Sequence, residues 1–469
     1  MKVLLIVPPN SAEERYGKFS EIGTLYPPLG LAYVAAVAEQ EAEVRVIDSE
    51  AMNYSYADIA RLTREFNPDI VGMQTYCTTI TRCYNVAKMI KKINKNVKII
   101  FGGAQVTLEP KTSILNKNVD FGIYGEGEFV FRDLIKELKK SENKPQFKKI
   151  KGLIWKNKNK IIINPKQDLI QKLDELPFPA RHLFPMHKYH SSANLRGKIT
   201  LNLMTSRGCP FNCAYCAGSL IFGKTHRYQG TEKVIEELLE LKNKYQADSI
   251  QFFDETFTAN RKRVIELCDK MIERKLNIEW SCFTRVNLVD LELLKKMKQA
   301  GCYLIFFGYE SGNQRLLNLI RKGITLEQSR KATKWCVEAG IESWGSFMLG
   351  LPTETKEESN QTIKFALDID PNFAQFTITT PFPGTDLYDI CKNHGKILTD
   401  NLDEYTAWEN VVFVSKGRTV EDIKSVVKKA YRTFYLRPSY VIRRFKSIIK
   451  LPLNKMVNLI ISAAYTFVK

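Results

Sequence analysis

The chain has 469 residues, a formal net charge of +19 and ten cysteines, and this length allows two to four domains whose cores need no disulfides. Seven cysteines are scattered without a Cys-x2-Cys pair, which is typical of a reducing cytosol and excludes a disulfide-rich secreted domain. The longest terminal apolar runs, 3–7 and 456–468, fall short of a membrane span of roughly 20 residues, so we predict a cytoplasmic protein.

Residues 1–140 alternate short apolar runs with helical patterns. Strands are predicted over 3–7, 44–47, 70–73, 97–101 and 121–124, and helices over 29–40, 56–66, 80–93 and 126–139. This alternation predicts an α/β fold with a five-stranded, doubly wound (Rossmann-like) parallel sheet.

In such a sheet a ligand binds beyond the carboxyl ends of the strands. Two glycine-rich loops are predicted there, Gly102-Gly103 and Gly125-Glu126-Gly127, where the backbone can approach a flat or phosphate-bearing ligand closely. A tight strand-to-helix turn explains each loop equally well. No Gly-x-Gly-x-x-Gly motif follows the first strand, which argues against an ordinary dinucleotide site.

Residues 141–198 are predicted to form a connector with a small hairpin over 152–163. Pro177 and Pro179 disfavour a helix and indicate an extended segment. His182, His187 and His190 follow it, either as linker residues at a domain boundary or as cofactor or substrate contacts.

Residues 199–393 alternate again, with six strand–helix units. Strands are predicted over 199–204, 249–253, 279–283, 303–307, 342–348 and 373–379, and helices over 232–244, 261–273, 290–299, 326–339 and 356–368. Six units are too few for an eight-fold barrel, and a second open, doubly wound sheet is the alternative to a partial barrel.

Three cysteines, Cys209, Cys213 and Cys216, follow the first of these strands in the pattern Cys-x3-Cys-x2-Cys. This set is one ligand short of a closed structural zinc site, whereas a cubane iron–sulfur cluster held by three cysteines keeps one iron open. Zinc, or three unrelated thiols, remain the alternatives. The loop, including Tyr215 before the third cysteine, resembles the signature of the radical S-adenosylmethionine (SAM) superfamily.

That resemblance implies a six-unit partial TIM barrel with a 4Fe-4S cluster and SAM at the strand ends. Asp254 and Glu255 follow the second strand, where they would bind the SAM amino group, unless they are simply solvated. Arg285 follows the third, where it would bind the SAM carboxylate or serve only as an ion-pair partner. Glu310 lies in a segment similar to the family's ribose-contacting segment.

The first domain also resembles a known one. Residues 27–33, 46–48, 68–72, 102–103 and 125–128 are similar, in order and spacing, to the cobalamin-binding domain of cobalamin-dependent radical SAM enzymes. Gln105 stands where members often carry histidine, and residues 1–181 contain no histidine. The resemblance therefore implies a base-off cobalamin with a vacant or weakly ligated lower face.

Residues 394–469 are predicted to form a C-terminal helical region, after a segment around 404–410 that returns over the barrel mouth. From residue 419 the pattern is basic, aromatic and amphipathic, which suits either packing on the barrel or a peripheral contact at the inner face of a membrane. We expect no nucleic-acid partner, because no binding module is recognisable. The basic residues are Arg432, Arg437, Arg443, Arg444, Lys446, Lys450 and Lys455.

The resemblance implies a cobalamin-dependent radical SAM methyltransferase acting on an unactivated carbon of a hydrophobic small molecule. SAM cleavage at the cluster would yield a 5′-deoxyadenosyl radical, and cobalamin would carry the methyl group. An external one-electron donor such as flavodoxin or ferredoxin is implied. The alternatives are a radical oxidative cyclase or ring-rearranging enzyme on a tetrapyrrole or lipid, and, in another class, a zinc-bearing RNA- or membrane-binding protein without catalysis.

Overall fold

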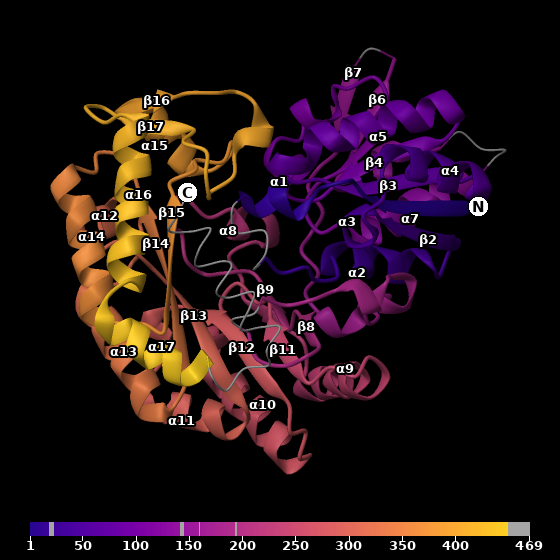
Figure 1. The fold of residues 1–469 in the computed structure, drawn as a ribbon. Coiled ribbons are helices and arrows are strands. Elements are labelled where there is room, and N and C mark those ends of the chain that lie inside the picture. Colours follow the sequence, from indigo (N-terminus) through magenta and orange to yellow (C-terminus); the bar gives the residue numbers. More distant parts are fainter. Residues whose placement is uncertain (18–22, 141–144, 159, 193–194, 449–469) are drawn as a thin grey trace.

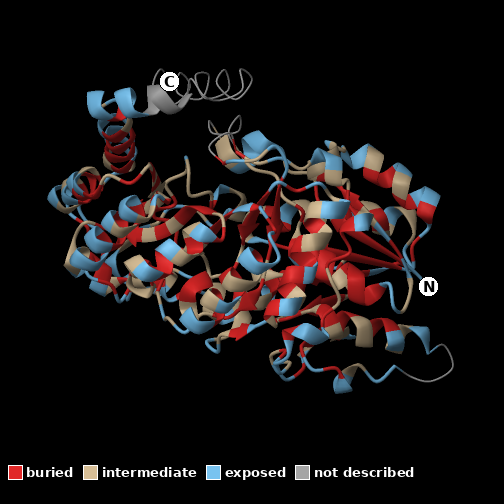
Figure 2. Ribbon diagram, turned by 90° about the horizontal axis from the view of Figure 1, so that it is seen from below, coloured by how far each residue is buried: buried red, intermediate tan, exposed pale blue. Residues whose placement is uncertain are grey.

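The computed structural model describes residues 1–17, 23–140, 145–158, 160–192 and 195–448, with side chains described up to residue 443. Two α/β units lie next to each other, each built on its own sheet (Figure 1). Buried residues are concentrated on the strands and on the helix sides that face them (Figure 2).

The first unit contains a seven-stranded sheet in the order β2-β1-β3-β4-β5-β6-β7. The five parallel strands that the sequence predicts are present, and the predicted hairpin adds two antiparallel strands at the β5 edge. The hairpin joins the sheet because Leu153 and Ile154 of its first strand are apolar and become fully buried there. The strands are β1 (Lys2–Val7), β2 (Glu43–Asp48), β3 (Ile70–Gln74), β4 (Lys98–Gly102), β5 (Phe121–Ile123), β6 (Leu153–Asn157) and β7 (Lys160–Ile163).

Helices cover both faces of this sheet, so the predicted doubly wound arrangement is confirmed. One face packs against α2 (Leu29–Ala38) and α7 (Glu128–Lys139), and the other against α4 (Tyr56–Phe66) and α5 (Ile80–Ile93). The sequence analysis missed three short helices, α1 (Ala12–Tyr16), α3 (Ser49–Met52) and α6 (Ala104–Leu108). A helix of one turn carries too few residues for a periodic pattern.

The second unit is a six-stranded parallel sheet in the order β15-β14-β13-β12-β11-β8, which leaves both edges unjoined, as a partial barrel requires. Its strands are β8 (Thr200–Leu203), β11 (Ser249–Phe252), β12 (Glu279–Thr284), β13 (Cys302–Glu310), β14 (Glu342–Leu349) and β15 (Phe373–Ile378). The helices α9 (Thr231–Lys244), α10 (Arg261–Glu273), α11 (Leu291–Gln299), α13 (Leu326–Ala339) and α14 (Lys356–Ile369) share a core with one face of the sheet.

The segment after the barrel reaches back to the first unit. Helix α15 (Asp386–His394), which the sequence analysis did not predict, leads into a hairpin of β16 (Gly395–Ile397) and β17 (Phe413–Ser415). Between these two strands, a short turn at Leu402–Glu404 contacts the turn Cys77–Thr79 of the first unit.

Helix α16 (Val420–Tyr435) packs on the barrel along its edge strand β15. Tyr435 Oη accepts a hydrogen bond from the Ala374 N–H and donates one to the Ala374 carbonyl, and Tyr431 Oη accepts one from the Phe376 N–H. This part of the predicted amphipathic region therefore belongs to the barrel. Helix α17 (Pro438–Ile448) follows. The structure does not describe four of the predicted basic side chains, those of Arg444, Lys446, Lys450 and Lys455.

Among the residues with described positions, no helix has both the length and the apolar character that crossing a membrane requires.

Candidate active site

The cysteine loop leaves the barrel through a short two-stranded ribbon. Strand β9 (Ser206–Arg207) pairs with β10 (Arg227–Tyr228). Gly208 follows with φ of 89°, and a Cβ atom there would lie 2.2 Å from the Thr225 carbonyl oxygen. Only glycine fits this position, so the ribbon fixes the start of the loop one residue before Cys209.

Each cysteine sulfur has its own neighbour. Cys209 Sγ lies 3.4 Å from the Thr256 hydroxyl, Cys213 Sγ accepts a hydrogen bond from Arg285 Nη1 at 3.3 Å, and Cys216 Sγ accepts one from the Gly218 N–H at 3.4 Å. In the described part of the chain, no three His, Cys, Asp or Glu side chains converge tightly enough to hold a single metal ion. Three cysteines on one loop, spread over separate neighbours, fit a polynuclear cluster better than the zinc alternative.

Asp254 is turned into the protein and not toward a ligand. Its carboxylate is 1% exposed and accepts hydrogen bonds from the Thr205 N–H at 2.7 Å, the Thr205 hydroxyl at 2.6 Å and the Ser206 hydroxyl at 2.5 Å. These bonds hold the backbone that enters the cysteine loop. The geometry supports a role for Asp254 in positioning the loop, and its contact with SAM stays a prediction.

Glu255 is the other acid of this pair. Its Oε2 atom is buried and has no hydrogen-bond partner among the described residues, and burial raises the pKa of Glu255 to about 7. The side chain lies beside the end of the cysteine loop, since a Cβ at Gly218 would be 3.4 Å from both Glu255 Cγ and Cys216 Sγ. A half-buried acid with an unused, shielded oxygen next to the cysteines is suited to bind a cationic group.

Arg285 is committed to the cysteine loop in this structure. Besides Cys213, its guanidinium contacts Asn287 Oδ1 at 3.2 Å and the carbonyl oxygens of Lys322 and Gly323, and it stacks over the Phe211 ring at 3.7 Å. Each guanidinium nitrogen therefore has a protein partner in this structure, and the contact of Arg285 with the SAM carboxylate stays a prediction. This arrangement supports a role in holding a cysteine thiolate.

Tyr215 and Glu310 meet, as their positions on the cysteine loop and at the end of β13 allow. Tyr215 Oη donates to Glu310 Oε1 at 2.8 Å, and Lys322 Nζ donates to both groups at 2.9 Å. Burial and the nearby Glu310 carboxylate raise the pKa of Tyr215. Glu310 has φ of 64°, an unfavourable value for a residue with a side chain, so this ion pair compensates a strained backbone.

A cavity of about 740 Å³ lies where the two units meet, within the size range of cofactor sites. The predicted loops Gly102-Gly103 and Gly125-Glu126-Gly127 line it from the first unit, and Asn202, Met204 and Phe253 from the barrel. A Cβ at Gly103, where φ is 95°, would lie 2.9 Å from the Thr75 carbonyl oxygen. The turn after β4 therefore requires glycine here, and this glycine-lined part of the cavity has no side chain in the way of a large, flat ligand such as a corrin ring.

Gln105 lines this cavity, whereas none of the histidines is among its lining residues. His182 is paired with Glu39 at 2.9 Å, and His190 forms backbone hydrogen bonds with Leu25. The cavity therefore offers an amide and no described imidazole to the lower face of a cobalamin.

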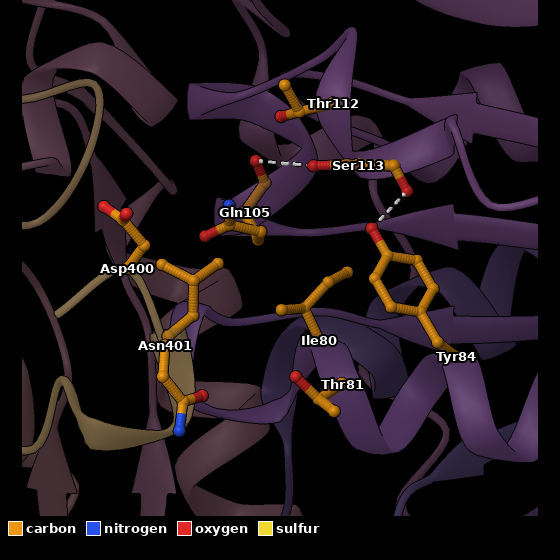
Figure 3. Close-up of a pocket in the computed structure, with 9 residues that line it drawn as sticks. Ile80, Thr81, Tyr84, Gln105, Thr112, Ser113, Asp400 and Asn401 are labelled. Atoms are coloured by element: carbon orange, nitrogen blue, oxygen red, sulfur yellow. Dashed lines mark hydrogen bonds between the residues drawn. The ribbon is translucent and has the colours of Figure 1, made fainter.

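A second hollow of about 260 Å³ lies between the first unit and the segment after the barrel (Figure 3). Figure 3 shows Gln105 between Ser113 on one side and Asp400 and Asn401 on the other. Ser113 Oγ donates to the Gln105 carbonyl at 3.3 Å. Because Gln105 also lines the larger cavity, it separates the two spaces.

A cluster of buried ion pairs joins residues 125–128 of the first unit to the ribbon of β9 and β10 that carries the cysteine loop. Glu126 accepts from Arg207 at 3.1 Å and from Arg227 at 2.9 Å, and Glu128 accepts from Arg207 at 2.6 Å. All four residues are 4% exposed. Glu126 is predicted to bind a cofactor. In the structure, its carboxylate forms ion pairs with two arginines at the contact between the two units. The sequence gives no signal for Arg207 and Arg227 beyond their nearness to Cys209.

Glu354 is a second buried acid, on the loop after β14. It accepts hydrogen bonds from the N–H groups of Gly350 and Leu351, the latter at 2.9 Å, and its Oε1 atom has no partner in the part of the chain that the structure describes. Burial raises the pKa of Glu354 to about 7. This carboxyl group fixes the backbone of the loop that follows β14.

The comparisons with known proteins agree with this geometry. The family model of the radical SAM superfamily matches residues 203–366, and that of the B12-binding domain matches residues 19–135. An uncharacterized methyltransferase of Pyrococcus horikoshii is 41% identical over 445 residues, which cover 94% of each chain. The anaerobic magnesium-protoporphyrin IX monomethyl ester cyclase of Rubrivivax gelatinosus is 28% identical over 94% of this chain and 78% of that protein.

Solved structures share the fold. The radical SAM methyltransferase TsrM from Kitasatospora setae superimposes with a TM-score of 0.71 at 16% identity, covering 92% of this chain and 90% of that one. The cobalamin-dependent radical SAM enzyme OxsB superimposes with a TM-score of 0.74 at 17% identity, covering 99% and 72%.

A radical SAM barrel joined to a B12-binding domain defines the class of this protein. The chain belongs to the family of cobalamin-dependent radical SAM enzymes. The predicted fold, the enzymatic nature of the protein and its three cofactors, a 4Fe-4S cluster, SAM and cobalamin, are confirmed.

Removing one charge from the buried ion cluster should destabilise the protein strongly. Glu126→Gln leaves Arg227 buried without its acid and should lower the free energy of unfolding by roughly 3–5 kcal/mol, measured by urea denaturation. Glu65→Gln is the control, because Glu65 pairs with Arg61 on the surface, where both side chains are 55% exposed and such pairs contribute at most about 0.5 kcal/mol. Equal effects of the two substitutions would contradict the interpretation.

The raised pKa of Glu354 predicts a pH-dependent stability. The folded protein keeps this proton up to a pH of about 7, whereas the unfolded chain releases it near the ordinary value of 4.5, so stability is lost as pH rises between the two. Glu354→Gln does not titrate. Between pH 5 and pH 8 the free energy of unfolding of the wild type should fall by roughly 2–3 kcal/mol relative to this variant.

Glu357→Gln provides the matched control, because Glu357 is exposed on the adjoining helix. The difference in free energy of unfolding between the wild type and Glu357→Gln should stay constant over the same pH range. A constant difference between the wild type and Glu354→Gln would contradict the assigned pKa direction.

Proposed function

We propose that this protein methylates an unactivated carbon of a hydrophobic small molecule. The observation that carries the proposal is the shared cavity, because the strand ends of the B12-binding domain and the barrel beside the cysteine loop line one space of about 740 Å³. A methyl donor and a carbon radical must meet with little access to water, and a cavity between two cofactor domains brings them together away from the outer surface. Several relatives are methyltransferases by name, including one for cytidylyl-2-hydroxyethylphosphonate in Streptomyces wedmorensis.

In this proposal, the chain holds each cofactor with separate residues. Cys209, Cys213 and Cys216 bind the cluster, and Arg285 stabilises the Cys213 thiolate. Glu255, with its unpartnered oxygen, binds the SAM amino group. Tyr215 and Glu310 form the wall beside the SAM ribose, where Lys322 fixes their orientation.

The glycines 102, 103, 125 and 127 would let cobalamin approach the strand ends of the first unit. When bound, the cluster supplies an electron for SAM cleavage and cobalamin supplies methyl-transfer chemistry. The residues of the chain position these groups and exclude water. A flavodoxin or ferredoxin is the external electron donor in this proposal.

A radical oxidative cyclisation or ring rearrangement is the second candidate. It is favoured by the similarity to magnesium-protoporphyrin IX monomethyl ester cyclases over most of the chain. Both candidates use the same site, and they differ in their products. Methyl transfer forms S-adenosylhomocysteine and 5′-deoxyadenosine, whereas cyclisation forms 5′-deoxyadenosine alone.

The product test uses anaerobic protein reconstituted with iron, sulfide and cobalamin, then supplied with SAM and reductant. We expect 5′-deoxyadenosine and S-adenosylhomocysteine, quantified by mass spectrometry. Replacing Cys209, Cys213 and Cys216 by Ala should abolish the cluster absorption and the 5′-deoxyadenosine. Cys268→Ala, in the core of the barrel, is the control and should preserve both. Unchanged 5′-deoxyadenosine in the triple variant would refute the radical mechanism.

A peripheral membrane contact is part of the proposal, supported by the basic region and by the exposed apolar side chains Val441 and Ile442 on α17. Residues 420–435 pack into the barrel core, so truncation at residue 419 would damage the fold. Removal of residues 449–469 together with Val441→Ser and Ile442→Ser should instead reduce binding to anionic lipid vesicles about tenfold in sedimentation assays. Unchanged vesicle binding would argue against the contact.

A further inference from the structure

Five aromatic side chains stand on successive strands of the barrel sheet. They are Phe253, Phe283, Phe306, Trp344 and Phe373, which we call the aromatic ladder. The strand register places Phe283 beside Phe306, Phe306 beside Trp344, and Trp344 beside Phe373. Their neighbours Phe252, Cys282 and Ala374 belong to the core under the helices, so the ladder lies on the opposite, inner face of the sheet.

The rings of the ladder stack on one another. Centroids lie 4.7 Å apart for Phe283 and Phe306, 5.1 Å for Phe306 and Trp344, and 4.9 Å for Trp344 and Phe373, with interplanar angles of 28°, 29° and 22°. Rings lying flat on the sheet could not approach so closely, so they stand upright. Their edges, and not their faces, therefore point into the barrel.

Ring edges carry the positive part of the aromatic quadrupole. They attract the electron-rich face of a conjugated ring in an edge-to-face contact. A saturated chain gains only the general effect of buried apolar area. A row of upright rings therefore favours a planar conjugated group over an aliphatic one.

The ladder continues the wall of the large cavity. Phe253 and Tyr26 both line the cavity and meet edge to face at 5.3 Å and 88°, and Phe253 contacts Phe283 at 5.9 Å. Phe253, Phe283, Phe306 and Trp344 are only partly buried. Phe253 therefore connects the cavity wall to the ladder. At the far end of the ladder, Phe306, Trp344 and Phe373 also pack against Leu195, Tyr303 and Leu304.

The ladder has an unused hydrogen-bond donor. Trp344 Nε1 is shielded from solvent and has no hydrogen-bond partner among the described residues. A buried indole N–H normally finds an acceptor, and leaving one unpaired is costly. This donor therefore indicates an acceptor atom on the molecule that rests there.

The ladder lies one layer below the cysteine loop. Side chains two residues further along the same strands share its face, and these are Arg285, Gly308 and Ser346. Arg285 contacts Cys213 Sγ, so the upper layer belongs to the candidate cluster site. A ligand on the ladder would therefore present its upper edge to the site of radical formation.

We propose that the aromatic ladder is the substrate platform, and that the substrate carries a planar conjugated ring system with a hydrogen-bond acceptor directed at Trp344 Nε1. This inference rests on the proposed function, because it assigns the substrate class of the same site. It narrows the proposed substrate class from hydrophobic small molecules to conjugated ring systems, and it excludes a purely isoprenoid chain.

The test compares three soluble probes that differ in one property each: quinolinylmethanol, naphthylmethanol and the saturated decahydronaphthylmethanol. Binding to the reconstituted holoenzyme with oxidised cofactors is measured by ligand-observed NMR titration. We expect the quinoline to bind about fivefold more tightly than the naphthalene through the Trp344 hydrogen bond, and the naphthalene about fivefold more tightly than the saturated probe.

Two variants separate the contributions. Trp344→Phe keeps a ring and removes the donor, so it should abolish only the preference for the quinoline. Phe306→Leu keeps apolar volume and removes a ring edge, so it should reduce the preference for naphthalene over its saturated counterpart. Trp335→Phe is the matched control, because Trp335 packs on the helix side of the sheet, and it should leave all three affinities unchanged.

Equal affinities for the three probes, or preferences that persist in Trp344→Phe and Phe306→Leu, would overturn the proposal. Production of 5′-deoxyadenosine and S-adenosylhomocysteine is measured separately in the wild type. If these products do not form, the proposed methyl transfer is refuted, but the measured preferences among the three probes are unaffected. The two failures can therefore be told apart.

Discussion

The structure depends on a small number of charges buried between its two units. Glu126 comes from the loop after β5 and Glu128 from the first turn of α7, and Arg207 and Arg227 come from the ribbon that carries the cysteine loop. Each charge alone would be expensive to bury, and together they compensate one another. Because Arg207 is two residues before Cys209, the same contact fixes the distance between the cavity and the cysteines.

Some polar residues of the site hold the cysteine loop in place, whereas others keep a polar atom that can still form a hydrogen bond. Asp254 and Arg285 use their hydrogen-bonding groups on the cysteine loop. Glu255 and Trp344 each keep a polar atom without a partner among the described residues, at different heights of the barrel. A buried polar atom left unpaired is costly, so each is a place where a ligand group can bind.

Periodicity in the sequence predicted most of the fold. The bounds of α5, α10 and α13 agree with the predicted ranges, because each helix has a long apolar face that recurs every three to four residues. Motif spacing likewise predicted the cysteine loop. The seven-stranded sheet was not anticipated, because the hairpin pattern shows that strands pair with each other and not which edge they join.

Partner choice was the part that sequence could not reveal. Nothing in the residues 125–128 indicates that Glu126 faces Arg227, about a hundred positions away, and Lys322 has no motif that would link it to Tyr215. The aromatic ladder is similar, because each ring looks like an ordinary strand residue until the register brings five strands together. Such contacts depend on tertiary placement, which local patterns do not encode.

An open sheet has two free edges, and unprotected edges recruit strands from other molecules. Here the β15 edge is closed by tyrosine hydroxyls of α16, which bond to the backbone of Ala374 and Phe376. At the other edge, Arg181 bonds to the Asn202 carbonyl, and the Asn202 amide bonds to the Pro27 carbonyl. Side chains thus cover the two sheet edges that two further strands would cover in a complete barrel. The enzyme can keep its barrel open toward a bulky ligand without becoming prone to polymerise through strand addition.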